Sequence, residues 1–213
     1  GVQTCALPIS FADTNRAELE KVLEYYKNDS LKLKAAIYLI ENMPLYYTYK
    51  GSDLDSLHIA LEQYAVSDSY DKHLEYLKRF PYRNLFKEYD AKVITSEYLI
   101  ENIEYSFKVW RETPWGKYVS FDNFCEFILP YRIKDEPLTH WKKDFYHRFK
   151  PVLDSLYQGT DVVEATSCLS NYATSLHWKY QNELTGPHLS AQLLLELQLG
   201  DCTSIADFEI GRA

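Results

Sequence analysis

The residue best suited to covalent chemistry is Cys202, which follows a leucine-rich segment and Gly200. Glycine is favoured just past a helix end, so the spacing places Cys202 where a second helix begins. The free N–H groups and positive dipole end of a helix favour thiolate over thiol, and thiolate is the form that attacks a carbonyl carbon. A single cysteine in apolar surroundings is also common as an inert core residue, so the spacing alone leaves both interpretations open.

The other cysteines and the histidines lack the pattern of a metal site or a disulfide framework. Without Cys5, an odd set of three remains, Cys125, Cys168 and Cys202, and no two of them form a C-x-x-C pair. Cys125 and Cys168 fall within apolar helical patterns, which predicts burial and a raised thiol pKa. No two histidines have the H-x-x-x-H spacing, with a carboxylate between them, that a helical zinc site needs. The sequence therefore predicts no metal and no cofactor.

Aromatic residues gather in two segments that could bind a ligand, one of them rich in proline and the other expected to be a loop. Aromatic and arginine side chains are frequent at binding hot spots, which favours a substrate cleft. The same residue types also hold helices together, so packing remains the alternative. The residues are Trp115, Tyr118, Tyr131 and Arg132 in segment 113–141, and Tyr46, Tyr47 and Tyr49 in segment 46–51.

Composition favours a globular, helical protein, because 46% of the 213 residues are apolar and only 7 are glycine. The net charge of -8 argues against a nucleic-acid partner, since such proteins concentrate Lys and Arg on one face. The one local basic cluster is predicted to be a solvated helix face. No apolar run approaches the roughly 20 residues of a membrane-spanning helix. The basic cluster comprises Lys142, Lys143, His147, Arg148 and Lys150.

Hydrophobic residues at three- and four-residue spacing predict one helix after another. Asp29 and Ser30 are expected to cap the second helix, and Pro44 to end it. The predicted helices span residues 15–28, 31–43, 53–64, 70–79, 96–110, 120–128, 153–157, 160–177 and 190–199. The inward-facing residues expected in the helix at 160–177 are Val162, Val163, Ala165, Thr166 and Leu169.

The segment around Cys202 also resembles a known nucleophile turn. Gly200-Asp201-Cys202, followed by the pattern Cys-x-x-x-Ala-x-Phe, is similar to the nucleophile segment of the bacterial transglutaminase-like superfamily, a branch of the papain-like fold. The words LPYR at 129–132 and DEPL at 135–138, with Trp141, resemble the helical region that precedes this core in one group of those proteins. The resemblance implies that Cys202 forms a thioester with an amide substrate, with a His and an Asp following on later strands.

The resemblance further implies a mainly α fold, with an irregular helical array over residues 10–159 and the first helices of a truncated papain-like α+β core over 160–208. It implies a protein or peptide substrate for the whole enzyme and an extracytoplasmic location. The expected substrate-binding residues are Trp115, Tyr131, Arg132 and His188. His188 is the histidine nearest to Cys202, and the helix expected between them would separate them by about 15 Å. Because the later His and Asp are not in this chain, we expect no acyl-transfer activity from it.

Residues 1–9 and 209–213 resemble translated sequencing adapter, so we expect them to make few contacts with the rest of the chain. The alternative function is a non-catalytic helical module that binds a glycan or a cell-surface protein through exposed aromatic residues. Convergence of Trp115, Tyr118 and the tyrosines of segment 46–51 on Cys202 would favour the enzyme. An exposed aromatic patch away from Cys202 would favour the binding module.

Overall fold

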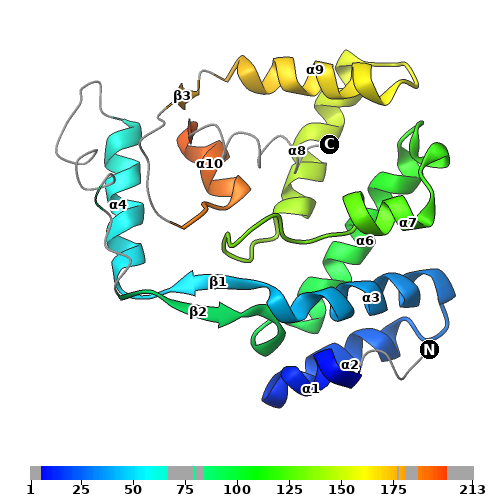
Figure 1. Ribbon diagram of the computed structural model, residues 1–213. Helices are drawn as coiled ribbons and strands as arrows, with labels where there is room; N and C mark the ends of the chain where they lie inside the picture. The colour runs from blue at the N-terminus through cyan, green and yellow to red at the C-terminus, as the bar shows by residue number, and fades with distance from the viewer. Residues whose placement is uncertain (1–5, 67–78, 80–83, 177, 181–186, 201–213) are drawn as a thin grey trace.

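The computed structural model describes residues 6–66, 79, 84–176, 178–180 and 187–200, and the chain is mainly helical, as the sequence predicts (Figure 1). The α-helices are α1 (Ala6–Phe11), α2 (Arg16–Tyr25), α3 (Ser30–Asn42), α4 (Asp53–Ala65), α6 (Ser96–Glu112), α7 (Phe121–Asn123), α8 (Trp141–Leu156), α9 (Val162–Thr174) and α10 (Ala191–Leu197). The 3-10 helices η1 (Asp13–Asn15), η2 (Met43–Leu45), η4 (Asp90–Lys92) and η5 (Gly116–Tyr118) and the π-helix η6 (Phe124–Ile128) connect them. The strands are β1 (Tyr47–Lys50), β2 (Phe86–Tyr89), β3 (Lys179–Tyr180) and β4 (Leu199–Gly200).

The first core lies where α1, α2, α3 and α6 pack together, at the lower right of Figure 1. Leu19 of α2, Ile40 of α3 and Ile103 of α6 are all fully buried, because each lies on an apolar stripe at helical spacing. The predicted cap of α3 is confirmed: the Asp29 carboxylate accepts hydrogen bonds from two backbone N–H groups of its first turn.

The N-terminal segment is in part packed against this core. Residues 6–9, which were expected to make few contacts, belong to α1, and Ile9 packs against the apolar residues of the first core. The expectation is therefore wrong for Ile9, because an apolar side chain on a helix next to a core gains by burial whatever its origin. Residues 1–5 and 209–213 lie outside the described residues.

A second core joins α8, α9 and α10, with α9 running along the top of Figure 1. Helix α8 continues through Pro151, whereas the sequence predicted a separate helix beyond this proline, over residues 153–157. Proline has no N–H to offer the carbonyl four residues earlier, that of His147. His147 is exposed, so water can satisfy this carbonyl and the helix is not interrupted.

The inward face of α9 differs from the predicted one. Val162 and Val163 are exposed, whereas Ala165, Leu169 and Ala173 are buried. The helix begins at Val162 after Asp161, whose carboxylate accepts from the first backbone N–H groups. The stripe that follows has a four-residue period, and the two valines of the first turn lie outside it.

Segment 46–51, expected to be a loop, contains a strand. Strand β1 pairs antiparallel with β2, from Tyr47 opposite Tyr89 to Lys50 opposite Phe86. Gly51, with φ 150°, ends β1 at a point where a Cβ atom would lie 2.2 Å from a backbone oxygen of residue 84, so only glycine fits. In Figure 1 the strand pair connects α4, on the left, with the first core.

The leucine-rich helix α10 ends earlier than predicted. Gln198 adopts the left-handed conformation at its C-terminus (φ 49°), and Gly200 instead belongs to β4, which pairs in parallel with β3. Leu199 is fully buried in a third apolar cluster with residues of α4. The burial of this side chain favours the end of the helix before Leu199. The helix predicted at 70–79 lies outside the described residues except for residue 79.

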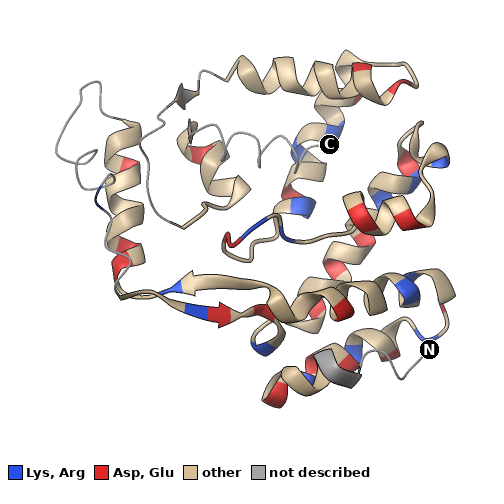
Figure 2. Ribbon diagram, in the orientation of Figure 1, with Lys and Arg blue, Asp and Glu red and all other residues tan. Residues whose placement is uncertain are grey.

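Helices α2, α3, α6 and α8 carry charged residues of both signs, whereas those of α4, α9 and α10 are all acidic (Figure 2). In the described ranges, no helix combines the length and the apolarity that crossing a lipid bilayer requires.

Candidate ligand-binding pocket

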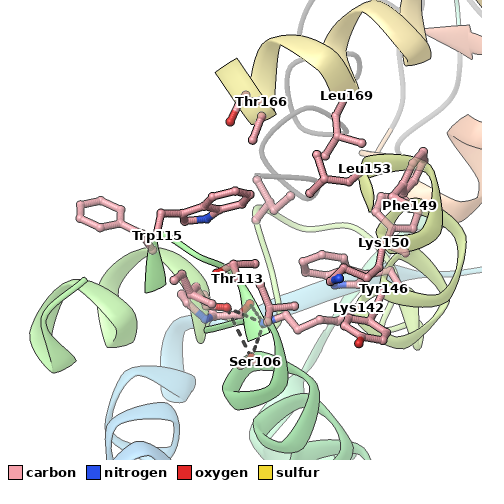
Figure 3. A pocket seen from close by; sticks show the side chains of 18 of the residues that line it. Ser106, Thr113, Trp115, Lys142, Tyr146, Phe149, Lys150, Leu153, Thr166 and Leu169 are labelled. Carbon is pink, nitrogen blue, oxygen red and sulfur yellow. Dashed lines mark hydrogen bonds between the residues drawn. The ribbon is translucent and has the colours of Figure 1, made fainter. Parts of the chain in front are cut away.

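A pocket of about 390 Å³ lies between α6, η6, α8 and α9. Figure 3 shows Ser106 and Lys142 at one end of it and Thr166 and Leu169 at the other, with the indole of Trp115 in between. Protein interiors leave few voids larger than a water molecule, so a pocket of this size is a feature to be explained. Its volume is within the range of small-molecule sites, roughly 300 to 1,000 Å³.

The walls of the pocket are mainly apolar. Phe145, Phe149 and Leu153 occupy successive turns of α8 and are buried, and Ala165 and Leu169 of α9 face them. The Phe145 and Phe149 rings meet edge to face at 5.2 Å, which holds both in fixed orientations. A ligand in contact with these walls would therefore bury hydrocarbon against a preformed surface.

Trp115 is positioned by a tight turn after α6. The Trp110 indole N–H donates to the Gly116 carbonyl at 2.9 Å and to the Val119 carbonyl at 3.2 Å. A Cβ atom on Gly116 would lie 1.7 Å from the backbone oxygen of Trp110, so no other residue fits there. The turn thus fixes the half-buried Trp115 side chain at the pocket wall.

Lys142 forms the polar end of the pocket. Its Nζ donates to Ser106 Oγ at 2.7 Å and to the backbone carbonyls of Ile128 (2.7 Å), Pro130 (3.0 Å) and Leu129 (3.2 Å). The methylene stem leaves the side chain half-buried, while the ammonium itself is enclosed, and this burial lowers the pKa of Lys142 to about 7. All four acceptors are neutral, so the ammonium is solvated by oxygen atoms without a counter-charge.

Three other charged side chains line the pocket, and each has a partner in the part of the chain that the structure describes. Lys142 differs from them, because among the described residues no carboxylate lies within ion-pair distance of it. The pairs are Arg132 with Asp90 (2.7 Å), Lys150 with Asp154 (2.6 Å) and Glu126 with the Tyr38 hydroxyl (2.9 Å).

The predicted solvated helix face is therefore wrong in part. His147 and Arg148 are exposed, and Lys143 pairs with Glu101 at 2.9 Å on the outside of α8. Lys142 instead points between α8 and α6, because it precedes the buried Phe145 by three residues and lies on the same face of the helix.

Of the four residues predicted to bind substrate, Trp115 and Arg132 line the pocket, whereas Tyr131 and His188 do not. Arg132 Nε and Nη2 donate to the two Asp90 carboxylate oxygens at 2.7 Å each, and Nη1 donates to the Glu136 carbonyl. Its donors are thus directed toward the protein. Burial raises the pKa of the Asp90 carboxyl, and the Arg132 guanidinium opposes that shift.

Tyr131 belongs to the first core. Its ring meets those of Tyr46 and Tyr98 edge to face, and its hydroxyl is buried without a hydrogen bond of good geometry. Burial, together with the Asp90 carboxylate, raises the pKa of Tyr131 well above its usual value. The substrate-binding role of this residue stays a prediction.

His188 pairs with Asp135. The imidazole Nδ1 is hydrogen-bonded to Asp135 Oδ1, which also accepts the backbone N–H of His188 at 3.3 Å. Burial is the largest single influence on the Asp135 carboxyl and raises its pKa, but the hydrogen bonds it accepts and the charge of His188 together outweigh burial, so the pKa is lowered. The carboxylate therefore orients one ring nitrogen, in the way that the third member of a catalytic triad does.

The predicted nucleophile, Cys202, lies outside the described residues, so its geometry is not part of this site. Cys125 is buried, as predicted, and burial raises its thiol pKa to about 11. Cys168 is half-buried, contrary to the prediction, because position 168 lies at the edge of the inward stripe of α9.

The aromatic residues predicted to bind a ligand do not lie together. Trp115 and Tyr46 line the pocket, whereas Tyr47 and Tyr49 meet edge to face on β1 and Tyr118 is exposed. In the described part of the chain, no group of three His, Cys, Asp or Glu side chains is placed to hold a metal ion.

Sequence reasoning missed Lys142 and Ser106, which together form the polar end of the pocket. Ser106 also donates to the Asn102 carbonyl at 2.7 Å within α6, a bond that fixes its hydroxyl. A signal for Lys142 was present, since a charged residue shares the helix face of Phe145 and Phe149. Comparison of the chain with family models, curated proteins and solved structures found no match.

Proposed function

We propose that this chain is a helical binding module whose pocket between α6, α8 and α9 takes up a small, largely apolar ligand. The observation that carries the proposal is the 390 Å³ pocket itself, with buried phenylalanine and leucine side chains along its walls. This proposal keeps the non-catalytic helical module of the sequence analysis but replaces its glycan or cell-surface protein by a small apolar ligand. The aromatic residues of the module contribute inside a pocket through Trp115 and Tyr46 rather than as one exposed patch.

Physical chemistry favours an occupant. Water in a mainly apolar pocket finds few hydrogen-bond partners, so displacing it by hydrocarbon is favourable by roughly 25 cal/mol per Å² of apolar surface buried. The walls are preformed, since Phe145 and Phe149 hold each other in place and Trp115 is fixed by the turn at Gly116. Binding then costs little reorganisation of the protein.

The neutral fluorescent probe N-phenyl-1-naphthylamine tests this proposal, because its emission rises when it leaves water. We expect saturable binding to the full chain. Thr166→Trp, which places a large side chain into the pocket from α9, should weaken it at least about tenfold, a loss of about 1.4 kcal/mol. Ser167→Trp is the matched control, since Ser167 is exposed on the same helix and does not line the pocket. Absence of saturable binding, or equal effects of the two variants, would refute the proposal.

A second candidate keeps the resemblance to transglutaminase-like proteins. We infer that the parent protein acts on amide bonds through a Cys202 thioester, and the His188–Asp135 pair supports this, because a carboxylate-oriented imidazole is the usual activator of such a thiol. Helix α10, which follows His188, has about 10 Å of rise and is shorter than the helix predicted from sequence.

Alkylation by iodoacetamide tests the second candidate without a substrate. Cys202 should react faster than Cys125 and Cys168, and His188→Ala should slow Cys202 while leaving Cys168 unchanged. Mass mapping of the labelled sites gives the three rates. If Cys202 reacts no faster than Cys168, this candidate fails. If Cys202 reacts faster but ignores the loss of His188, the His188–Asp135 pair gives the candidate no support, and the activating base of the parent protein is the later histidine that the resemblance implies.

A further inference from the structure

The polar end of the pocket carries a positive charge that the described protein does not neutralise. Lys142 Nζ meets one hydroxyl and three carbonyl oxygens, and the face of the Trp141 ring lies 5.3 Å from it. These groups solvate an ammonium but leave its charge uncompensated. A buried cation is most stable beside an anion, so a pocket that presents one favours a ligand that supplies the anion.

Other lysines of α8 have carboxylate partners, one from α6 and one from α8 itself. Lys143 pairs with Glu101 at 2.9 Å and Lys150 pairs with Asp154 at 2.6 Å. Lys142 lies between α8 and α6, where Ser106 and Asn102 are the nearby polar residues of α6. The missing counter-ion is therefore specific to the lysine that faces into the pocket.

We propose that the ligand of this pocket is an apolar monocarboxylate, whose carboxylate pairs with Lys142 while its hydrocarbon body lies along Phe149, Leu153 and Leu169. The inference rests on the proposed ligand binding and adds the charge and the orientation of the ligand. Figure 3 shows the geometry that supports it, with Lys142 at one end of the pocket and Leu153 and Leu169 toward the other.

Lys142 can donate a hydrogen bond to a carboxylate without leaving any of the three surrounding carbonyls without a hydrogen bond. Four acceptors share its three N–H groups, and the longest of the four contacts is the 3.2 Å bond to the Leu129 carbonyl. The Leu129 carbonyl also accepts from Asn102 Nδ2 at 2.8 Å. When an incoming carboxylate takes one N–H, two remain for the Ile128 and Pro130 carbonyls, and the Leu129 carbonyl keeps its bond to Asn102. Ser106 Oγ then loses the bond from Lys142 but still donates to the Asn102 carbonyl, and the exchange adds a charge-assisted hydrogen bond to the carboxylate.

The protonation of Lys142 should control the affinity. The groups around Lys142 Nζ are the Ser106 hydroxyl of α6, the carbonyls of η6 and the following loop, and the Trp141 ring of α8. The other ionisable side chains of the pocket are held by partners: Arg132 and Lys150 by carboxylates, Glu126 by the Tyr38 hydroxyl, and Tyr146 by Glu112, while burial raises the pKa of Tyr46. Lys142, with a pKa near 7, is then the group that titrates between pH 6 and pH 9.

Octanoate and 1-octanol, matched in chain length, test the inference by displacement of N-phenyl-1-naphthylamine. At pH 6.5 the wild-type chain should bind octanoate about tenfold more tightly than 1-octanol, as one charge-assisted hydrogen bond provides. Lys142→Met should abolish this preference. Lys143→Met removes the neighbouring lysine, which pairs with Glu101 on the outside of α8 and does not line the pocket, and it should retain the preference.

A measurement on the unmodified chain covers the case that Lys142→Met does not fold. Calorimetry of octanoate binding in buffers of different ionisation enthalpy should show uptake of nearly one proton at pH 8 and almost none at pH 6, because the carboxylate returns Lys142 to its charged form. Octanoate affinity should fall about tenfold per pH unit above pH 7. Binding of both probes without preference for octanoate, or without proton uptake, overturns the inference alone. Failure of N-phenyl-1-naphthylamine and 1-octanol to bind overturns the proposed function.

Discussion

Replacing Asp90 by asparagine should destabilise the protein severely. The Asp90 and Arg132 side chains are 0% and 1% exposed, and the carboxylate accepts two guanidinium hydrogen bonds at 2.7 Å. Asparagine keeps the size but removes the charge, so the buried guanidinium loses its counter-ion. Breaking a buried pair in this way costs about 3 to 5 kcal/mol, a large part of the 5 to 15 kcal/mol typical of a domain.

The assay is urea unfolding followed by tryptophan fluorescence and circular dichroism. Asp154→Asn is the matched control, because it breaks the Lys150–Asp154 pair, whose aspartate is 58% exposed, and should cost no more than about 0.5 kcal/mol. The double change Asp90→Asn with Arg132→Met should be less destabilising than Asp90→Asn alone, since it removes the unpaired charge. A loss below about 1 kcal/mol for Asp90→Asn would refute the reasoning that this pair fixes the segment after η6 to the first core.

Three further changes have expected outcomes. Gly116→Ala should cost roughly 2 to 4 kcal/mol of unfolding free energy, since its Cβ would lie 1.7 Å from the Trp110 oxygen, and a neutral result in thermal unfolding would contradict the turn geometry. Stability should rise between pH 7 and pH 9 by up to about 1.4 kcal/mol per unit, because the folded pKa of Lys142, about 7, lies below the unfolded value of about 10.4 and the unfolded chain binds the extra proton. Lys142→Met should flatten that slope in urea titrations, and a slope unchanged in the variant would exclude Lys142 as its source. Iodoacetamide should label Cys168 faster than Cys125, because burial raises the thiol pKa of Cys125 to about 11. Mass mapping of the labelled native protein measures both rates, and faster labelling of Cys125 would contradict this expectation.

The first core could be predicted because its signals are local. Leu19 and Val22 of α2, and the corresponding stripes of α3 and α6, repeat every three or four residues, and Asp29 lies where a helix cap is expected. These patterns need no knowledge of distant residues. The helices they predict agree with the structure to within a few residues at each end.

The elements that were missed depend on partners far along the chain. The Tyr and Thr residues of segment 46–51 favour a strand locally, and this signal was overlooked. Strand β1 contains only four residues and its partner β2 lies about forty residues later, so the pairing itself could not be predicted from the segment alone. The Asp90–Arg132 pair likewise joins residues 42 positions apart. Arg132 was predicted as a binding residue from its type alone, and only the fold shows that its donors are directed at a buried carboxylate.

Lys142 and Lys143 show what a sequence pattern does and does not contain. The two residues are chemically identical neighbours, yet one meets Glu101 on the outside of α8 and the other is enclosed between α8 and α6. The difference follows from helical phase, because position 142 shares a face with Phe145 and Phe149 whereas position 143 does not. A charged residue in phase with an apolar stripe is costly to bury, so its presence demands a compensating group. Here the described protein supplies only neutral oxygens, and the remaining compensation must come from a ligand or from loss of the proton, which are the two states that the binding and pH experiments separate.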